Sequence, residues 1–164
     1  MQDPQHTQAF IQAVESIFAD MFRMPLSLTD PRAKGKEEPW LDITGTINLT
    51  GSLSGTMALT FERATAEGVV SEMVGRPMDF ETEETADAIG EIANIVAGMA
   101  KAKINIDGSL SITCPTITRG ACVTRLQSES DAVAIDLNCP VGPLRLELSL
   151  VPTDAGADTQ TAAA

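Results

Sequence analysis

The sequence predicts an α+β domain in which three helices pack on a largely antiparallel sheet of about six strands. Segments in which apolar residues alternate with polar ones come in adjacent pairs, whereas a parallel sheet would alternate them with helices. Segments with helical apolar spacing precede the first pair and separate it from the later strands. The length of 164 residues suits one domain, which we expect over residues 1–152. Residues 153–164 are small and polar and are expected to form a disordered tail.

The first helix is predicted over residues 8–22, and a polar connection follows it. Pro25 and the polar segment 29–39 end the helical pattern. Six apolar side chains recur at helical spacing and are expected to face the core: Phe10, Ile11, Val14, Ile17, Phe18 and Met21.

A β-hairpin is predicted over residues 41–61, with its turn at Gly51 and Ser52. Gly45 and Gly55 interrupt the inward positions, which indicates close packing or a bulge. The apolar side chains that share the inward face are Leu41, Ile43, Ile47, Leu49, Leu53, Met57, Leu59 and Phe61.

Two helices are predicted next, over residues 65–74 and roughly 82–104. Gly75 is a natural C-terminal stop for the first of them, and Thr82 is a candidate N-cap for the second. The second helix carries acidic residues near its start and basic ones near its end, which complements the helix dipole.

The C-terminal part of the sequence predicts about four strands, over residues 109–118, 121–127, 131–137 and 143–151. The segment 138–143 is expected to join the last two as a hairpin loop. In the final strand, four leucines alternate with polar residues: Leu144, Leu146, Leu148 and Leu150 against Arg145, Glu147 and Ser149.

Composition excludes several function classes. The net charge is −12 and no basic cluster is present, so nucleic-acid binding is not expected. No apolar run reaches the roughly 18 residues that a membrane span needs. The N-terminus has no basic region followed by an apolar stretch, so we expect no signal peptide and a cytoplasmic protein.

Residue usage also limits the available chemistry. Cys114, Cys122 and Cys139 are widely spaced without a C-x-x-C motif, so they predict no disulfide framework or zinc site and are expected to be small buried residues. His6 is the single histidine, which excludes a His-dependent triad or a His-rich metal site. Phosphate-binding glycine motifs are absent. Any chemistry must therefore use carboxylates, amides or the groups of a partner.

One stripe of the helix over 82–104 has an unusual composition. Asp87, Glu91, Asn94, Gly98 and Lys101 fall on the same side at 100° per residue. Asn and Gly are poor helix formers, and a face that only meets solvent would more readily be Glu, Lys, Gln or Ala. The opposite arc is expected to face the core and consists of Ile89, Ile92, Ala93, Val96 and Ala100.

Two interpretations of this stripe follow from spacing. A solvated surface is the simpler one and accounts fully for the charged residues. A partner-binding surface accounts better for Asn94 and Gly98. Gly98 would let another backbone approach, and Asn94 offers both a donor and an acceptor that can orient a water molecule. Glu91 would then pair with a cation of the partner.

The pattern Asp87-x-x-x-Glu91-x-x-Asn94-x-x-x-Gly98 resembles the D/S-x-x-x-E-x-x-N signature of the CheC/CheX/FliY chemotaxis phosphatases. The surrounding "AIGEIANIVAG" is similar to the CheX version of that helix, and "ITCPTITRG" (112–120) resembles the strand that follows it. The upstream "ITGTINLTGSLSGTMALTF" and "AEGVVSEMVG" are similar to the family's hairpin and next helix. The resemblance covers roughly residues 8–151.

This resemblance implies a phosphatase acting on the aspartyl phosphate of a CheY-like receiver domain in two-component signalling. Asn94 would enter the receiver's active site and position the attacking water, and Glu91 would bond to the receiver's lysine. Asp87 and Gly98 would contact the partner. Mg²⁺ would belong to the receiver, and no cofactor is expected on this chain.

The resemblance also implies a homodimer. A single motif and this length are similar to CheX, whose members join their sheets, whereas CheC-type chains carry two motifs. Phe18 stands in the first helix where a second motif would need Asn, so that helix is predicted to be core.

Two other functions remain open at this level. Related folds occur in flagellar rotor-switch proteins, so the chain would also suit a non-catalytic receiver-binding adaptor. Such a module would slow the decay of a phosphorylated receiver instead of accelerating it. Glu84, Asp87 and Glu91 share one helix face and offer carboxylates for a metal, although hard cations need more oxygen ligands from several directions.

Overall fold

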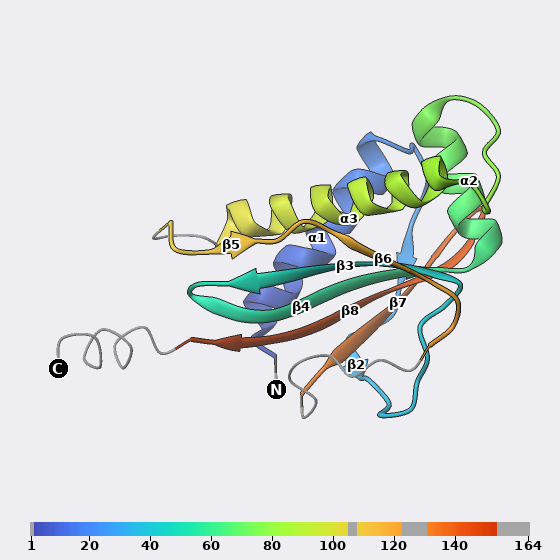
Figure 1. Cartoon of the computed structure of the whole chain (residues 1–164). Coiled ribbons are helices and arrows are strands. Elements are labelled where there is room, and N and C mark those ends of the chain that lie inside the picture. The colour runs from blue at the N-terminus through green and yellow to red at the C-terminus, as the bar shows by residue number, and fades with distance from the viewer. Residues whose placement is uncertain (1, 105–107, 123–130, 154–164) are drawn as a thin grey trace, which may run out of the picture.

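The computed structural model describes residues 2–104, 108–122 and 131–153. Three helices and one antiparallel sheet make up this part of the chain, as predicted (Figure 1). The tail expected over 153–164 lies outside the described residues except for Thr153. Among the residues that the structure describes, no helix is both long enough and apolar enough to cross a membrane.

The sheet consists of eight strands in the order β1-β7-β8-β4-β3-β5, with β2 also paired to β7 and β6 also paired to β3. Two short strands in the expected polar connection and a split in the strand expected over 109–118 raise the number above six. The bounds are β1 (Ser27–Leu28), β2 (Arg32–Ala33), β3 (Ile43–Thr50), β4 (Leu53–Phe61), β5 (Ser111–Ile112), β6 (Thr116–Arg119), β7 (Val133–Cys139) and β8 (Gly142–Pro152).

Asp3 is the N-cap of helix α1 (Pro4–Asp20), and its side chain accepts a hydrogen bond of 2.8 Å from the backbone N–H of Gln5. Five of the six predicted core residues are buried, including Phe18, which confirms this helix as core. Met21 is the exception and is exposed, because the helix has already ended. Phe22 takes the core position instead and packs edge-on against Phe18, with ring centroids 5.1 Å apart.

The predicted hairpin is confirmed as β3 and β4, which bury one apolar face beneath the helices. Gly45 marks close packing, as expected: a methyl group there would lie only 2.9 Å from the Cβ atom of Ala93 on the helix above. The absence of a side chain at this position therefore lets a helix lie directly on the strand.

Helices α2 (Arg63–Val74) and α3 (Glu83–Ile104) follow the hairpin. Gly75 ends α2 in the left-handed conformation, with φ of 81°, as its position predicted. Thr82 caps α3, because its hydroxyl accepts a hydrogen bond of 3.2 Å from the backbone N–H of Thr85. Figure 1 shows α3 running along the sheet beside β5 and β6, with α1 behind it.

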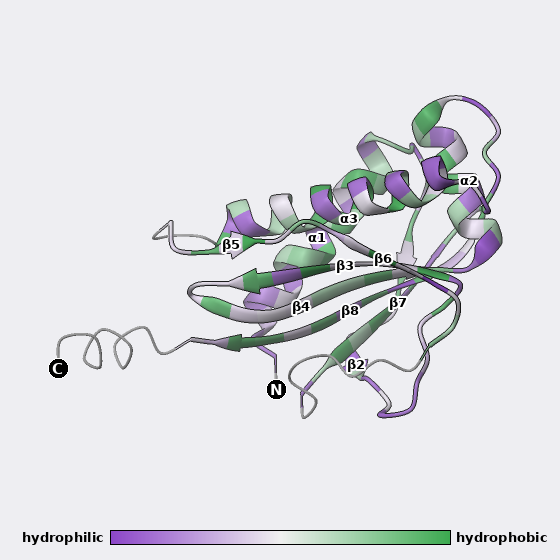
Figure 2. Ribbon diagram, in the orientation of Figure 1, coloured by the Kyte–Doolittle hydropathy of each residue, from purple (hydrophilic) through white to green (hydrophobic). Residues whose placement is uncertain are grey.

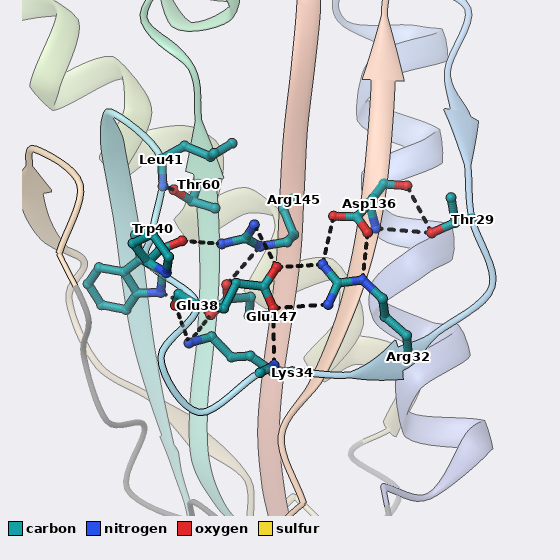
Figure 3. Close-up of polar contacts among 12 residues, drawn as sticks. Thr29, Arg32, Lys34, Glu38, Trp40, Leu41, Thr60, Asp136, Arg145 and Glu147 are labelled. Carbon is teal, nitrogen blue, oxygen red and sulfur yellow. Dashed lines mark hydrogen bonds and ion pairs between the residues drawn. The ribbon is translucent and has the colours of Figure 1, made fainter.

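The second face of the sheet differs most from the sequence-based expectation. Glu147 lies on the side of β8 where polar residues alternate with the leucines, and it is fully buried. Its carboxylate accepts hydrogen bonds from Arg145 Nε (2.8 Å) and Trp40 Nε1 (2.9 Å) and lies 3.5 Å from Lys34 Nζ (Figure 3). The segment 29–39, predicted as a simple polar connection, lies across this face together with Trp40 and removes the charged groups from water.

A second group of charges anchors this segment at its start. Arg32 donates hydrogen bonds to Glu38 (2.6 and 2.9 Å) and to Asp136 on β7 (2.7 and 3.2 Å), as Figure 3 shows. These contacts lower the pKa of Glu38 from 4.5 to about 2, chiefly through the hydrogen bonds from Arg32, and raise the pKa of Arg32. The segment is thus an ordered part of the fold.

Three smaller expectations need correction. The loop expected over 138–143 is much tighter, because β7 continues to Cys139 and β8 begins at Gly142. Cys139 is buried as predicted, but Cys114 is exposed and Cys122 is half-buried, and all three are free thiols. The strand expected over 121–127 lies mostly outside the described residues.

Candidate functional site

The stripe predicted from sequence lies on the outer side of α3. Asp87 and Glu91 are exposed, whereas Asn94, Gly98 and Lys101 are half-buried. The residues predicted for the opposite arc are all buried against the sheet and α1. Figure 2 shows the same division, with hydrophilic and hydrophobic residues alternating along the turns of α3.

Two glycine contacts hold the middle of α3 in place. Gly45 of β3 lies under Ala93, as described above. Gly90 faces the chain around β6: a methyl group there would lie 3.2 Å from Ile117 Cδ1 and 3.4 Å from Pro115 Cγ. Ala93 and Gly90 directly precede Asn94 and Glu91 in the sequence. The backbone of both candidate residues is therefore fixed by adjacent tight contacts.

Gly98 is different from these glycines. Apart from the backbone of its own helix turn, a methyl group at Gly98 would meet no atom of the described residues within 4 Å. Glycine in a helix interior is about 1 kcal/mol less favourable than alanine, and no packing among the described residues requires it here. The side of the stripe at Gly98 is thus open for the approach of another molecule.

The polar side chains of the stripe are not engaged within the molecule. In the described part of the chain, the side chains of Asp87, Glu91 and Asn94 form no hydrogen bond or ion pair. By contrast, Glu84 in the first turn of α3 binds Arg76, with oxygen–nitrogen distances of 2.5 and 2.6 Å. The stripe therefore presents two carboxylates and one carboxamide to its surroundings.

The described residues do not assemble a metal centre on this face. No group of three or more His, Cys, Asp or Glu side chains within them is placed to hold a metal ion. Glu84, which belonged to the hypothetical carboxylate set, is occupied by Arg76. The stripe offers carboxylate and carboxamide acceptors, the amide donor of Asn94 and the ammonium group of Lys101, which are groups suited to binding and orienting a partner.

The sequence did not indicate what flanks this stripe. Pro115 and Ile117 were predicted as parts of one strand, and their contact with Gly90 came only with the folded structure. Arg119 donates to the carbonyl oxygens of Phe80 and Thr82 just before α3. The strand after the motif helix thus supports that helix from the side.

Comparison with known proteins assigns the chain to a family. The family described as "Chemotaxis phosphatase CheX" matches residues 43–138, which is more than half of the chain and includes the whole stripe. The chain belongs to the CheX family of chemotaxis phosphatases. This assignment confirms the resemblance seen in the sequence and the expected enzyme class, a phosphatase and hence a hydrolase.

Individual CheX relatives agree with the family assignment. The CheY-P phosphatase CheX of Thermotoga maritima is 29% identical over 120 residues, which cover 72% of this chain and 77% of the relative. A CheC-like superfamily protein from Shewanella sp. PV-4 has a TM-score of 0.83 at 21% identity, covering 92% and 99% of the two chains. This similarity confirms the predicted α+β fold of CheC type.

A second similar structure contains a partner. The crystal structure of a CheX–CheY–BeF3–Mg²⁺ complex from Borrelia burgdorferi has a TM-score of 0.74 at 22% identity, covering 88% of this chain and 97% of that one. Its similarity to this chain is one of fold.

Proposed function

We propose that the protein hydrolyses the aspartyl phosphate of a CheY-like response-regulator receiver. The observation that carries the proposal is the outer stripe of α3, where Glu91, Asn94 and Gly98 face outward without internal partners among the described residues. The T. maritima relative is named a CheY-P phosphatase, and the B. burgdorferi structure is a complex with CheY. Both names support a CheY-like receiver as the substrate.

In the proposed mechanism, this chain supplies geometry and the receiver supplies the phosphoryl group. Asn94 enters the receiver's active site, where its carboxamide accepts one hydrogen bond from a water molecule and aligns that water with the phosphorus atom. The water oxygen bonds to phosphorus as the phosphorus–oxygen bond to the aspartate breaks. Both protons of the water stay on the phosphate, so the products are the free aspartate carboxylate and inorganic phosphate. Orienting water by a carboxamide is the means by which GTPases accelerate a comparable displacement.

The other residues of the stripe serve docking. Glu91 binds the receiver's active-site lysine, one turn before Asn94, and so sets the depth to which the amide enters. Asp87 contacts the receiver at the edge of the interface, and Gly98 leaves room for its backbone. Mg²⁺ belongs to the receiver in this mechanism, in keeping with the B. burgdorferi complex, which contains Mg²⁺ and CheY.

Asn94→Ala tests the central assignment. The rate of dephosphorylation of a receiver from the same organism is measured with Mg²⁺ present, and we expect the variant to lose about a hundredfold or more of the acceleration, because the water is no longer aligned. Lys103→Ala is the matched control, since Lys103 is exposed on the same helix and, among the described residues, its side chain bonds to Gln12 alone. Thermal unfolding of both variants verifies the fold.

Two results would contradict the proposal. Full activity of Asn94→Ala would remove this residue from the reaction. A wild-type protein that binds the phosphorylated receiver but slows its decay would be an adaptor and not a phosphatase.

We further propose that the protein is a homodimer formed by joining sheets. In the described residues, β5 and β6 pair only with β3, so the outer side of this sheet edge carries unused backbone groups. Light scattering is expected to give twice the chain mass of 17.3 kDa. A mass of one chain at micromolar concentration would contradict this proposal.

A further inference from the structure

Arg119, at the end of β6, binds the backbone that leads into α3. Its two terminal nitrogens donate hydrogen bonds to the carbonyl oxygens of Phe80 (2.6 Å) and Thr82 (2.7 Å). Its guanidinium carbon also lies 5.2 Å from the centroid of the Phe80 ring. A planar guanidinium holds two acceptors in a fixed arrangement, so this contact fixes the start of the helix relative to the sheet edge.

Helix electrostatics do not explain this arginine. A cation near a helix N-terminus opposes the helix dipole, and Arg119 touches Thr82, the capping residue itself. Thr82 is already held by local contacts: its hydroxyl donates to the carbonyl of Asp79 (3.0 Å) and accepts the N–H of Thr85 (3.2 Å). Since the cap is complete without Arg119, the added contact serves to join the helix to β6.

The same strand region supports α3 again near its functional residues. Pro115 and Ile117 lie against Gly90, which directly precedes Glu91. The chain from Pro115 to Arg119 therefore touches α3 at its start and again two turns later. The core packing of α3 on β3 and α1 holds the helix against the sheet. The contacts at Gly90 and at the N-terminal end add two lateral supports along the helix axis, which restrain its direction and with it the position of the Asn94 side chain.

We propose that Arg119 is a positioning residue for the phosphatase reaction: by holding the first turn of α3 on β6, it sets the angle at which Asn94 and Glu91 meet the receiver. This inference rests on the proposed function. It involves no contact between Arg119 and the receiver. Because a displacement of about 1 Å can cost about a hundredfold in rate, a small change in helix direction is enough to impair the reaction.

The test separates turnover from docking and from folding. Arg119→Ala and Arg119→Lys are compared with the wild type for kcat and KM on a phosphorylated receiver. The number of binding-competent chains is counted by titration with a receiver carrying beryllofluoride and Mg²⁺. We expect kcat of Arg119→Ala to fall about tenfold or more, with KM within about threefold of the wild type and unchanged binding stoichiometry.

The conservative variant and a matched control sharpen the result. Arg119→Lys keeps the charge but has a single donating nitrogen in place of the two that bind the carbonyls, so its kcat is expected to lie between those of the wild type and Arg119→Ala. Arg76→Ala removes another arginine that binds the first turn of α3, but its ion pair with Glu84 is exposed, and this variant should keep wild-type kinetics. Hydrogen exchange of amides 83–90 should accelerate in Arg119→Ala and not in Arg76→Ala.

Unchanged kcat in Arg119→Ala would overturn the inference. So would a fall in kcat that merely follows a fall in the number of binding-competent chains, because that pattern indicates a loss of folded protein. Failure of the wild-type protein to accelerate receiver decay would instead overturn the proposed function and, with it, this inference.

Discussion

Three glycines around the candidate site differ in what a side chain would meet. At Gly45 and Gly90 an added methyl group would approach atoms of the same chain at 2.9 and 3.2 Å, so internal packing accounts for both. At Gly98 it would meet nothing within 4 Å. Sequence alone could not separate these cases: Gly45 and Gly98 both interrupted a regular pattern, and Gly90 drew no prediction. Gly98 is thus the one of these three whose small size is not explained by packing against the described part of the chain.

Replacement of Gly98 tests this distinction. Gly98→Leu should increase the free energy of unfolding by up to about 1 kcal/mol, because leucine is a better helix former and the position is open. The same change should lower kcat/KM for a phosphorylated receiver by about tenfold or more, since the side chain occupies the space that the partner's backbone needs. Chemical denaturation and dephosphorylation kinetics measure the two effects.

Lys103→Leu serves as the control, because it adds the same side chain at an exposed position off the stripe. Activity that stays at the wild-type level in Gly98→Leu would show that no partner approaches the helix at this point.

The elements were predicted best where local patterns decide them. The bounds of α3, its cap at Thr82 and the buried arc opposite the stripe all agree with the sequence-based expectation. The strand expected over 109–118 is divided because Pro115 has no N–H for the ladder. Next to it, the hydroxyl of Thr113 accepts the backbone N–H of Asn48 (3.1 Å) and replaces a regular ladder bond. This interruption brings Pro115 against α3, beside the candidate site.

Both faces of the sheet are covered in the folded molecule, one by the helices and the other in part by the segment 29–39 with Trp40. The packing of this segment on the sheet depends on charged side chains. Lys34 and Glu147 are 6% and 0% exposed at their side chains, and a buried carboxylate is tolerated only with cations and donors around it. Glu38, in the same segment, forms ion pairs with Arg32 and Arg145.

The depressed pKa of Glu38 makes its contribution to stability depend on pH. Its pKa falls from 4.5 to about 2 in the folded protein, so the contribution is complete above about pH 4.5 and is lost as the pH falls toward 2. We expect Glu38→Gln to be less stable than the wild type at pH 7, and the difference to shrink at pH 2.5. Urea unfolding at both pH values measures it.

Glu37→Gln is the control, since Glu37 is the exposed neighbour in the sequence. An equal difference between Glu38→Gln and the wild type at both pH values would exclude a role for the ionised carboxylate.

Sequence by itself determined the features that depend on neighbours along the chain. It determined the fold class, the helix that carries the candidate site and the side of that helix on which Glu91 and Asn94 lie, because helical and strand periodicities are local properties. Tertiary structure decided the burial of Glu147, the open space at Gly98 and the hydrogen bonds of Arg119 to the start of α3. Each of these depends on contacts between segments that are far apart in the sequence, such as β6 with Phe80 or Lys34 with β8. A local sequence pattern does not encode such contacts.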